Sequence, residues 1–262
     1  MNDTNFNADI NIGLPEPSQI PELKALWQEA FGDSAIYIDS FFKTAFSHKR
    51  CRCATLGGEL VSALYWFDCS YGGGRVAYLY AVATAKAYRG RGFCRILMED
   101  THAYLKKLGY ACSVLVPGDE GLFNFYASLG YKTFGKVKNF HAASKEKSVK
   151  IRRINAEEYT QQRRSFLPVG AVIQENENIS FLETQFSFYT GDDFLLAVRV
   201  DNGKLFCAEL LGNADKAPEI LTSLGCKTGV FRTPGADTLF AMYCPTSDTF
   251  KEPPTYFGLA FD

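Results

Sequence analysis

Apolar residues along the chain recur with two spacings, one typical of helices and the other of strands. Between residues 20 and 30 they stand three or four positions apart, which predicts a helix with one apolar face that is closed by Gly32. A second helix is expected from about Ser34, and a short strand over residues 10–14 precedes both. The chain is therefore expected to open with a strand and two amphipathic helices.

Strand-like runs dominate the next part of the chain. The runs 51–56 and 60–68 are separated by Gly57-Gly58-Glu59, which predicts a hairpin, and Gly72-Gly73-Gly74 follows the second run. The elements expected after these glycines are a strand over 78–84, a helix carrying the apolar residues 96–108, a strand over 111–116, a helix between Asp119 and Gly130, and a strand near 132–141.

A charged stretch of small residues, Ser144-Lys145-Glu146-Lys147-Ser148, is the predicted domain boundary. It separates a domain of residues 1–143 from a smaller one of residues 149–262. The elements expected in the second domain are a strand over 149–154, a helix over 156–166 capped by Asn155, a helix over about 179–189, a hairpin of 194–200 with 205–211, a helix over about 214–224, and strands over 230–233 and 239–244. This order echoes the first domain, so we expect an α/β fold of the α+β kind, built from two similar parts.

Composition limits the classes of partner. The 262 residues include 28 basic and 29 acidic side chains, so the net charge gives no reason to expect nucleic acid or an anionic membrane as a partner. No apolar run is long enough to span a membrane, and the polar residues 1–7 do not resemble a signal peptide. The 8 cysteines form no Cys-x-x-Cys pair and the 3 histidines make no metal-binding spacing. We therefore expect reduced thiols, no metal and a cytoplasmic location.

The strongest chemical signal lies between the strand at 78–84 and the helix that follows it. Arg89-Gly90-Arg91-Gly92 supplies two glycines and two guanidinium groups at this point. Glycines let the backbone N–H groups at a helix N-terminus approach a phosphate closely, and the arginines add positive charge. The loop is therefore a candidate site for a phosphorylated cofactor.

Two common phosphate loops fit this stretch less well. A nucleotide P-loop needs a Lys-Ser or Lys-Thr pair at the start of the helix, and Phe93-Cys94 does not provide it. A dinucleotide fingerprint needs a third glycine or alanine where Arg95 stands, and an acidic residue after the next strand, which instead runs into Pro117-Gly118. A surface turn whose glycines only permit the bend is a further alternative.

A third pattern matches better. Arg89, Gly92 and the position of Cys94 resemble the acetyl-CoA loop of the GNAT acetyltransferase superfamily, in which Arg or Gln, two residues, Gly, one residue, and Gly or Ala follow one another. Cys94 departs from this pattern, although a thiol is only slightly larger than a methyl group. The order of elements over residues 1–143 also resembles the GNAT order. The resemblance implies a mixed, mostly antiparallel sheet flanked by helices.

The same resemblance implies acetyl-CoA as the cosubstrate, held by strand backbone and by the glycine loop. The implied cofactor-binding positions are Val82, Thr84, Arg89, Gly90, Arg91, Gly92, Phe93, Cys94 and Asn124. The tyrosine of a Phe-Tyr-x-x-x-Gly-aromatic segment, here Tyr126, would protonate the departing thiolate. A phenol, with an ordinary pKa of about 10, is a reasonable acid for that step. The alternative is that Tyr126 is an ordinary core residue at helical spacing.

The second domain lacks the glycine loop, because Gly212-Asn213-Ala214-Asp215 contains no Gly-x-Gly and no arginine. We therefore expect a degenerate GNAT-like domain and one cofactor site, as in tandem acetyltransferases of the Eis type, to which the chain is distantly similar. In those relatives the C-terminal carboxylate returns to the catalytic domain, which would bring Asp262 toward the site. The alternative is that the apolar segment 256–262 is a last strand packed in its own domain.

The expected function is transfer of an acetyl group from acetyl-CoA to an amine of a small molecule or peptide. The strand at 78–84 carries no carboxylate, so Glu59, Asp68, Asp119 or ordered water are the candidate bases. An aromatic wall would suit an apolar or aromatic amine, and an acidic wall a polyamine or aminoglycoside. The alternatives are a non-catalytic acyl-CoA-binding sensor or scaffold, or transfer of a longer acyl group, by a monomer or a homodimer.

Overall fold

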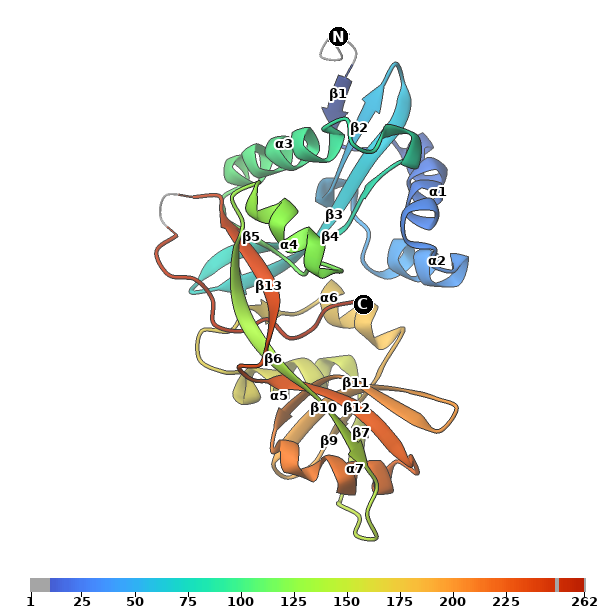
Figure 1. Ribbon diagram of the computed structural model, residues 1–262, viewed down its shortest axis with the longest axis vertical. Coiled ribbons are helices and arrows are strands. Elements are labelled where there is room, and N and C mark those ends of the chain that lie inside the picture. Colours follow the sequence, from blue (N-terminus) through green and yellow to red (C-terminus); the bar gives the residue numbers. More distant parts are fainter. Residues whose placement is uncertain (1–9, 248–249, 262) are drawn as a thin grey trace.

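The computed structural model describes residues 10–247 and 250–261 of the chain, in two groups of elements stacked along one long axis (Figure 1). The helices are α1 (Ile20–Phe31), α2 (Ala35–Thr44), α3 (Phe93–Lys107), α4 (Glu120–Ala127), α5 (Ala156–Phe166), α6 (Glu177–Glu183) and α7 (Ala217–Ser223). The strands are β1 (Ile10–Gly13), β2 (Cys51–Leu56), β3 (Glu59–Tyr71), β4 (Gly74–Thr84), β5 (Tyr110–Leu115), β6 (Lys132–Ala143), β7 (Arg152–Ile154), β8 (Ile173–Gln174), β9 (Ser187–Thr190), β10 (Phe194–Asp201), β11 (Lys204–Gly212), β12 (Thr228–Pro234) and β13 (Thr238–Pro245). We call β1 to β6 with their helices the N-terminal half, and everything from β7 onward the C-terminal half.

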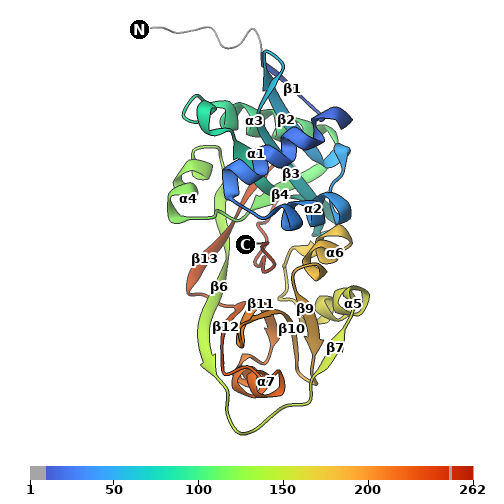
Figure 2. The ribbon, with the colours of Figure 1, turned by 90° about the vertical axis from the view of Figure 1, so that its right-hand side faces the viewer.

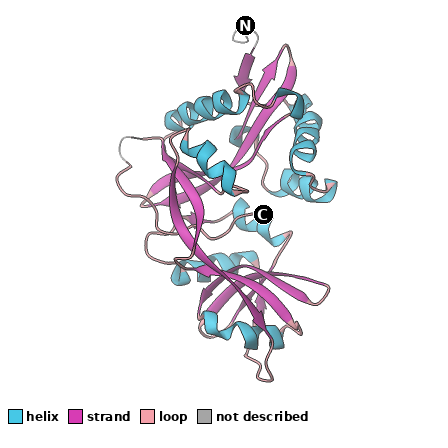
Figure 3. Cartoon of the chain, viewed as in Figure 1, coloured by secondary structure: helices cyan, strands magenta, loops and turns pink. Residues whose placement is uncertain are grey.

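All the long strands belong to one sheet that runs through both halves (Figure 3). The strand order is β1-β2-β3-β4-β5-β13-β6-β12-β11-β10-β9-β7, and β8 pairs with β3 outside this path. Neighbouring strands are antiparallel except for β4 with β5 and β11 with β12. The mixed, mostly antiparallel sheet flanked by helices is therefore confirmed.

The two halves are joined through an exchange of strands. β6 is long and twists from one half into the other, so that its first part pairs with β13 and its second part with β12. β13, from the C-terminal half, lies between β5 and β6 of the N-terminal half. Backbone hydrogen bonds of the sheet therefore cross from one half to the other, so neither half completes its sheet with its own strands alone.

Both faces of the N-terminal sheet are buried, which explains the nearly continuous apolar runs in its strands. Along β3, Tyr65 and Phe67 point into the core under α1 and α2, whereas Leu64 and Trp66 point into a separate core under α3. Figure 2 shows α1 and α2 on one side of this sheet and α3 on the other. The strands in the middle of the sheet thus separate two hydrophobic layers.

Most boundaries of the helices and strands were predicted correctly from local signals in the sequence. The Ser34 hydroxyl accepts a hydrogen bond from the Tyr37 N–H at the start of α2, and the Asp119 carboxylate caps α4 in the same way. Gly32 ends α1 with a positive φ of 73°, a conformation that glycine adopts without strain. Capping chemistry acts within a few residues, so it can be recognised without the tertiary structure.

The C-terminal half differs from the sequence analysis in three places: one prediction is wrong, one strand was not predicted, and one alternative is excluded. The helix expected over 179–189 ends at Glu183, and residues 187–190 form β9 because they pair with β10. β8 was not expected, since its two residues become a strand only by pairing with β3. The segment after Thr255 is not a strand either: it makes a single isolated bridge, between Tyr256 and Ala171. These elements depend on long-range partners rather than on local periodicity.

A buried ion pair anchors that last segment. Glu209 of β11 is fully buried and accepts two hydrogen bonds from the guanidinium group of Arg163, at 2.7 and 2.9 Å. The hydroxyl groups of Tyr159 and Tyr256 donate to the same carboxylate at 3.0 and 2.9 Å. Because every oxygen of the buried carboxylate has partners, its charge is compensated, and Tyr256 is fixed in place.

No helix in the described part of the chain has the length and hydrophobicity needed to cross a lipid bilayer.

We expect Arg163→Met to lower the free energy of unfolding by about 3–5 kcal/mol, because it leaves the Glu209 carboxylate buried without a counter-charge. Urea denaturation followed by circular dichroism measures this change. Arg152→Met is the matched control, since Arg152 pairs with Glu158 on the surface, where solvent screens the interaction. An Arg163 variant as stable as the Arg152 variant would contradict the anchoring role.

Candidate active site

The site begins where two neighbouring strands separate. The parallel pairing of β4 with β5 runs from Arg75 to Tyr78 on β4 and reaches Val114 on β5. β4 then continues to Thr84 while β5 ends at Leu115. Since strands in a sheet lie only about 5 Å apart, loss of this pairing opens a gap between them that a ligand can enter.

A β-bulge interrupts the regular pairing of β4 with β3 at the edge of this gap. Tyr80 pairs with Tyr65 and Ala83 with Ala63, so that Ala81 and Val82 together face the single residue Leu64 of β3. Ala81 has a φ of +47°, a left-handed conformation that costs energy for a residue with a Cβ. A bulge leaves one residue outside the regular ladder, and here both Ala81 and Val82 line the gap. This bulge was not predicted from the sequence, because no glycine marks it.

The glycine loop lies directly after β4. Gly90 and Gly92 have φ values of +76° and +86°, so both positions require the freedom of glycine. A Cβ added at Gly92 would meet no protein atom within 4 Å. No side chain caps α3, whose first backbone bond runs from the Ile96 N–H to the Gly92 carbonyl. The N–H groups of the first turn therefore have no side-chain cap and are available to an anion.

The predicted loop residues divide into exposed and packed positions. Arg89 and Arg91 are exposed, and the Arg89 Nε donates to the Thr84 carbonyl at 3.0 Å, which ties the loop to the end of β4. Phe93 is buried under the first turn of α3, and Cys94 is half-buried beside it. The structure thus brings Thr84, the two arginines and the free helix end together.

A cavity of about 390 Å³ fills the gap between β4 and β5. Its lining residues are Trp27, Phe31, Asp33, Tyr78, Leu79, Tyr80, Ala81, Val82, Leu115, Val116, Pro117, Gly118, Leu122, Tyr126, Ala260 and Phe261. Val82 and Tyr126, both predicted from the sequence, lie on its wall. Asn124 is exposed on α4 and does not line it.

Tyr126 is 8% exposed, so its phenol lies where water is largely excluded. Burial, and then the neighbouring Cys94 and Asp119, raises the pKa of Tyr126 above its ordinary value. Burial also raises the pKa of the Cys94 thiol to about 11. Both groups are therefore protonated at neutral pH, and Tyr126 is able to donate a proton.

The C-terminal segment closes one side of the cavity. The Phe261 carbonyl accepts hydrogen bonds from the hydroxyl groups of Tyr37 and Tyr80, at 3.2 and 3.3 Å, and these two hydroxyls are 2.6 Å apart. The Phe261 ring packs 4.8 Å from the ring of Phe67 in β3. The last described residues thus pack against the N-terminal half, and the interpretation as a strand within the C-terminal half is wrong. Asp262 lies outside the described residues.

None of the three carboxylates expected as a base lines the cavity. Glu59 accepts from Tyr88 at 2.6 Å, and Asp119 caps α4. Asp68 pairs with Arg50 and Arg75 at the opposite end of β4 from the glycine loop. Among the described residues, the carboxylate that does line the cavity is Asp33, in the turn between α1 and α2. Nothing in its local sequence distinguishes it from an ordinary turn aspartate.

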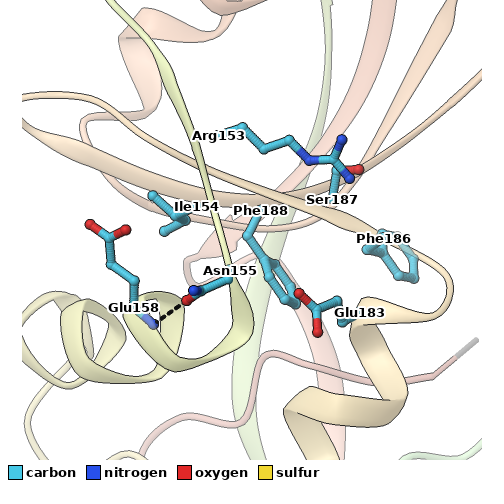
Figure 4. Close-up of a pocket in the computed structure, with 8 residues that line it drawn as sticks. All are labelled: Arg153, Ile154, Asn155, Glu158, Glu183, Phe186, Ser187 and Phe188. Carbon is cyan, nitrogen blue, oxygen red and sulfur yellow. Dashed lines mark hydrogen bonds between the residues drawn. The ribbon is translucent and has the colours of Figure 1, made fainter.

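A second hollow, of about 410 Å³, lies in the C-terminal half (Figure 4). Asn155 lines it and accepts a hydrogen bond from the Glu158 N–H, so the nearest helix end is already capped. Glu183 accepts from the Ala156 N–H, and Glu158 pairs with Arg152. These polar groups stabilise the start of α5. No group of three or more potential metal ligands occurs in the described part of the chain.

Solved structures share this fold over nearly the whole chain. A GCN5-related N-acetyltransferase from Kribbella flavida aligns with a TM-score of 0.68 and 18% identity, covering 90% of this chain and 70% of that one. Eis1 from Mycobacterium abscessus aligns with a TM-score of 0.64 and 12% identity, covering 90% and 73%. A putative acetyltransferase from Pyrococcus horikoshii aligns with a TM-score of 0.62 and 14% identity, covering 99% and 97%. At these identities the likeness concerns the fold.

No curated protein sequence matches the chain significantly. The family model described as an acetyltransferase (GNAT) domain matches residues 12–134, a range that contains β4, the glycine loop and Tyr126. The N-terminal half of this chain is therefore a GNAT acetyltransferase domain.

Proposed function

We propose that this protein is an acetyl-CoA-dependent N-acyltransferase that moves an acetyl group to an amine by direct attack on the thioester. The observation that carries the proposal is that β4, which ends in the uncapped glycine loop before α3, also forms with its bulge one wall of the cavity that holds Tyr126. Phosphate binding and proton donation are thus available at the two ends of one site.

The residues present fit the cosubstrate. The open space at Gly92 leaves room for a pyrophosphate against the first N–H groups of α3, and Arg89 and Arg91 add positive charge beside it. Backbone groups of Val82 and Thr84 would hold the pantetheine arm, which supplies the activated acetyl group. Asn124 is proposed as a peripheral contact, because it is exposed on α4, the helix that carries Tyr126.

Two groups act at the thioester in this proposal. The backbone N–H of Val82, beside the bulge, stabilises negative charge on the carbonyl oxygen as the amine attacks. As the C–N bond forms and the C–S bond breaks, Tyr126 donates its proton to the leaving sulfur, and its raised pKa keeps that proton available over the working pH range. The proton that the amine loses passes to water, and water returns a proton to Tyr126. The half-buried site limits water, which protects the thioester from hydrolysis.

We also propose that the C-terminal half is a repeat of the N-terminal fold without a cofactor site. In each half, two helices follow the first strand. An antiparallel strand pair, a helix and a parallel strand come next, as β3, β4, α3 and β5 in the N-terminal half and as β10, β11, α7 and β12 in the C-terminal half. At the second helix start, the Asn213 amide donates to the Asp193 carboxylate at 2.7 Å. That carboxylate would repel a phosphate. The domains proposed are residues 1–143 and 149–262.

All eight cysteines of the chain are free thiols in the structure, and most are buried. Unpaired cysteines are usual in a reducing compartment, so we propose a cytoplasmic location.

We expect Gly92→Val to weaken acetyl-CoA binding by at least about a hundredfold, because a branched side chain would fill the phosphate space and strain the loop. Isothermal titration calorimetry measures the affinity. Gly57→Val is the matched control: Gly57 also has a positive φ with open space around it, but it lies in the β2–β3 hairpin. Equal affinities of the two variants for acetyl-CoA would contradict the assignment of the phosphate site.

We expect Tyr126→Phe to slow acetyl transfer by about 10²–10⁴-fold while acetyl-CoA affinity is kept, because only proton donation is lost. Release of free thiol in the presence of an amine panel measures the rate, and Tyr189→Phe on β9 is the control. A wild-type protein that binds acetyl-CoA but acylates no amine would favour the non-catalytic acyl-CoA-binding sensor instead. The mass of the product distinguishes acetyl from longer acyl groups.

The pH dependence follows from the same phenol. Because its pKa is raised, Tyr126 keeps its proton at pH values above about 10, where an ordinary tyrosine would lose it. An acceptor amine meanwhile loses its proton as the pH rises. We therefore expect kcat to stay level or increase between about pH 8 and about pH 10. A fall within this range that disappears in Tyr126→Phe would contradict the raised pKa.

A further inference from the structure

We infer that the acceptor is a monocationic amine with an aromatic or apolar body, whose ammonium group binds to Asp33. The inference rests on the proposed acyl transfer and narrows its substrate class. It is carried by the chemistry of the cavity wall, which combines several aromatic side chains with one carboxylate.

The cavity reaches through the sheet from one hydrophobic layer to the other. Leu122 and Tyr126 belong to the layer under α3, where the glycine loop lies. Trp27 and Phe261 belong to the layer under α1 and α2. The cosubstrate therefore has its residues on one face, and the opposite face, with Asp33, is left for the acceptor. The two meet at the bulge of β4.

Asp33 is held in a defined orientation. The Trp27 Nε1–H donates to its Oδ2 at 2.8 Å, and the carboxylate is only partly exposed. A carboxylate oxygen accepts more than one hydrogen bond, so this contact leaves capacity for an ammonium donor. A carboxylate fixed by a neighbouring indole and facing a partly enclosed cavity attracts a cation more strongly than one in open water.

Aromatic rings continue from Asp33 into the cavity. The ring of Trp27 lies 6.3 Å from that of Phe31 and 5.4 Å from that of Tyr80, and Tyr80 lies 5.5 Å from Phe261. Such a wall buries an apolar or aromatic body and also attracts a cation through the ring faces. Phe31 is 49% exposed, which places an apolar surface at the entrance.

The number of charged side chains on the described cavity wall indicates which class of amine fits it. Asp33 is the one charged side chain among the sixteen described residues that line the cavity. A polyamine or aminoglycoside would bring several positive charges against apolar rings, where each unpaired charge costs desolvation energy. A single ammonium group pairs with Asp33, and it loses one proton to water before its nitrogen attacks the thioester. The described part of the wall is thus aromatic with one acid, rather than acidic.

The test is titration of the CoA-saturated protein with 2-phenylethylamine by calorimetry, with spermidine, kanamycin A and the neutral 2-phenylethanol as comparison ligands. Asp33→Asn keeps an acceptor for the Trp27 Nε1–H and removes only the charge. Asp39→Asn is the control, because Asp39 is an exposed carboxylate on α2 that pairs with Lys24 away from the cavity. CoA affinity is measured in each variant.

We expect 2-phenylethylamine to bind the wild type and the Asp39 variant equally, and the Asp33 variant at least about tenfold more weakly. The comparison ligands should bind more weakly than 2-phenylethylamine. Tighter binding of spermidine or kanamycin A, no binding of 2-phenylethylamine, or equal binding by Asp33→Asn would overturn the inference, provided that CoA binds. Failure of the wild type to bind CoA would instead overturn the proposed function, and this inference with it.

Discussion

The buried pair of Arg163 and Glu209 is the interaction on which the shape of the site depends. It lies in the C-terminal half, yet it fixes Tyr256, which belongs to the segment that reaches Phe261 in the cavity of the N-terminal half. Gln174 supports the same segment, since its Nε2–H donates to the Leu259 carbonyl at 2.7 Å. A fully buried carboxylate is costly unless it is compensated, so this network has one arrangement of low energy.

The N-terminal half consequently depends on the C-terminal half, which lacks the glycine loop. β13 supplies the neighbour of β5 within the sheet, and the last described residues supply one wall of the cavity. In the proposed function, the C-terminal half shapes the acceptor side and binds no second cosubstrate. The exchange of β6 and β13 between the halves makes the two parts one structural unit.

The other constraint is local to β4. The strand pairs with β3 along its length, but its pairing with β5 ends at Tyr78. The bulge at Ala81 and Val82 lies where β4 and β5 diverge. The strained φ of Ala81 persists because β3 fixes the strand on both sides of it. Strain of this kind, placed between the free N-terminus of α3 and the cavity, aims backbone groups at the point where the proposed reaction takes place.

The sequence alone determined what depends on neighbours in the chain. Caps such as Ser34 and Asp119, the glycine loop and the helix that carries Tyr126 were predicted, because short-range sterics and hydrogen bonds specify them. Only the tertiary structure decided the exchange of strands, the bulge, the position of Asp33 and the return of Phe261 to the N-terminal half. These features arise from contacts between residues far apart in sequence, and such contacts leave no periodic pattern in the chain.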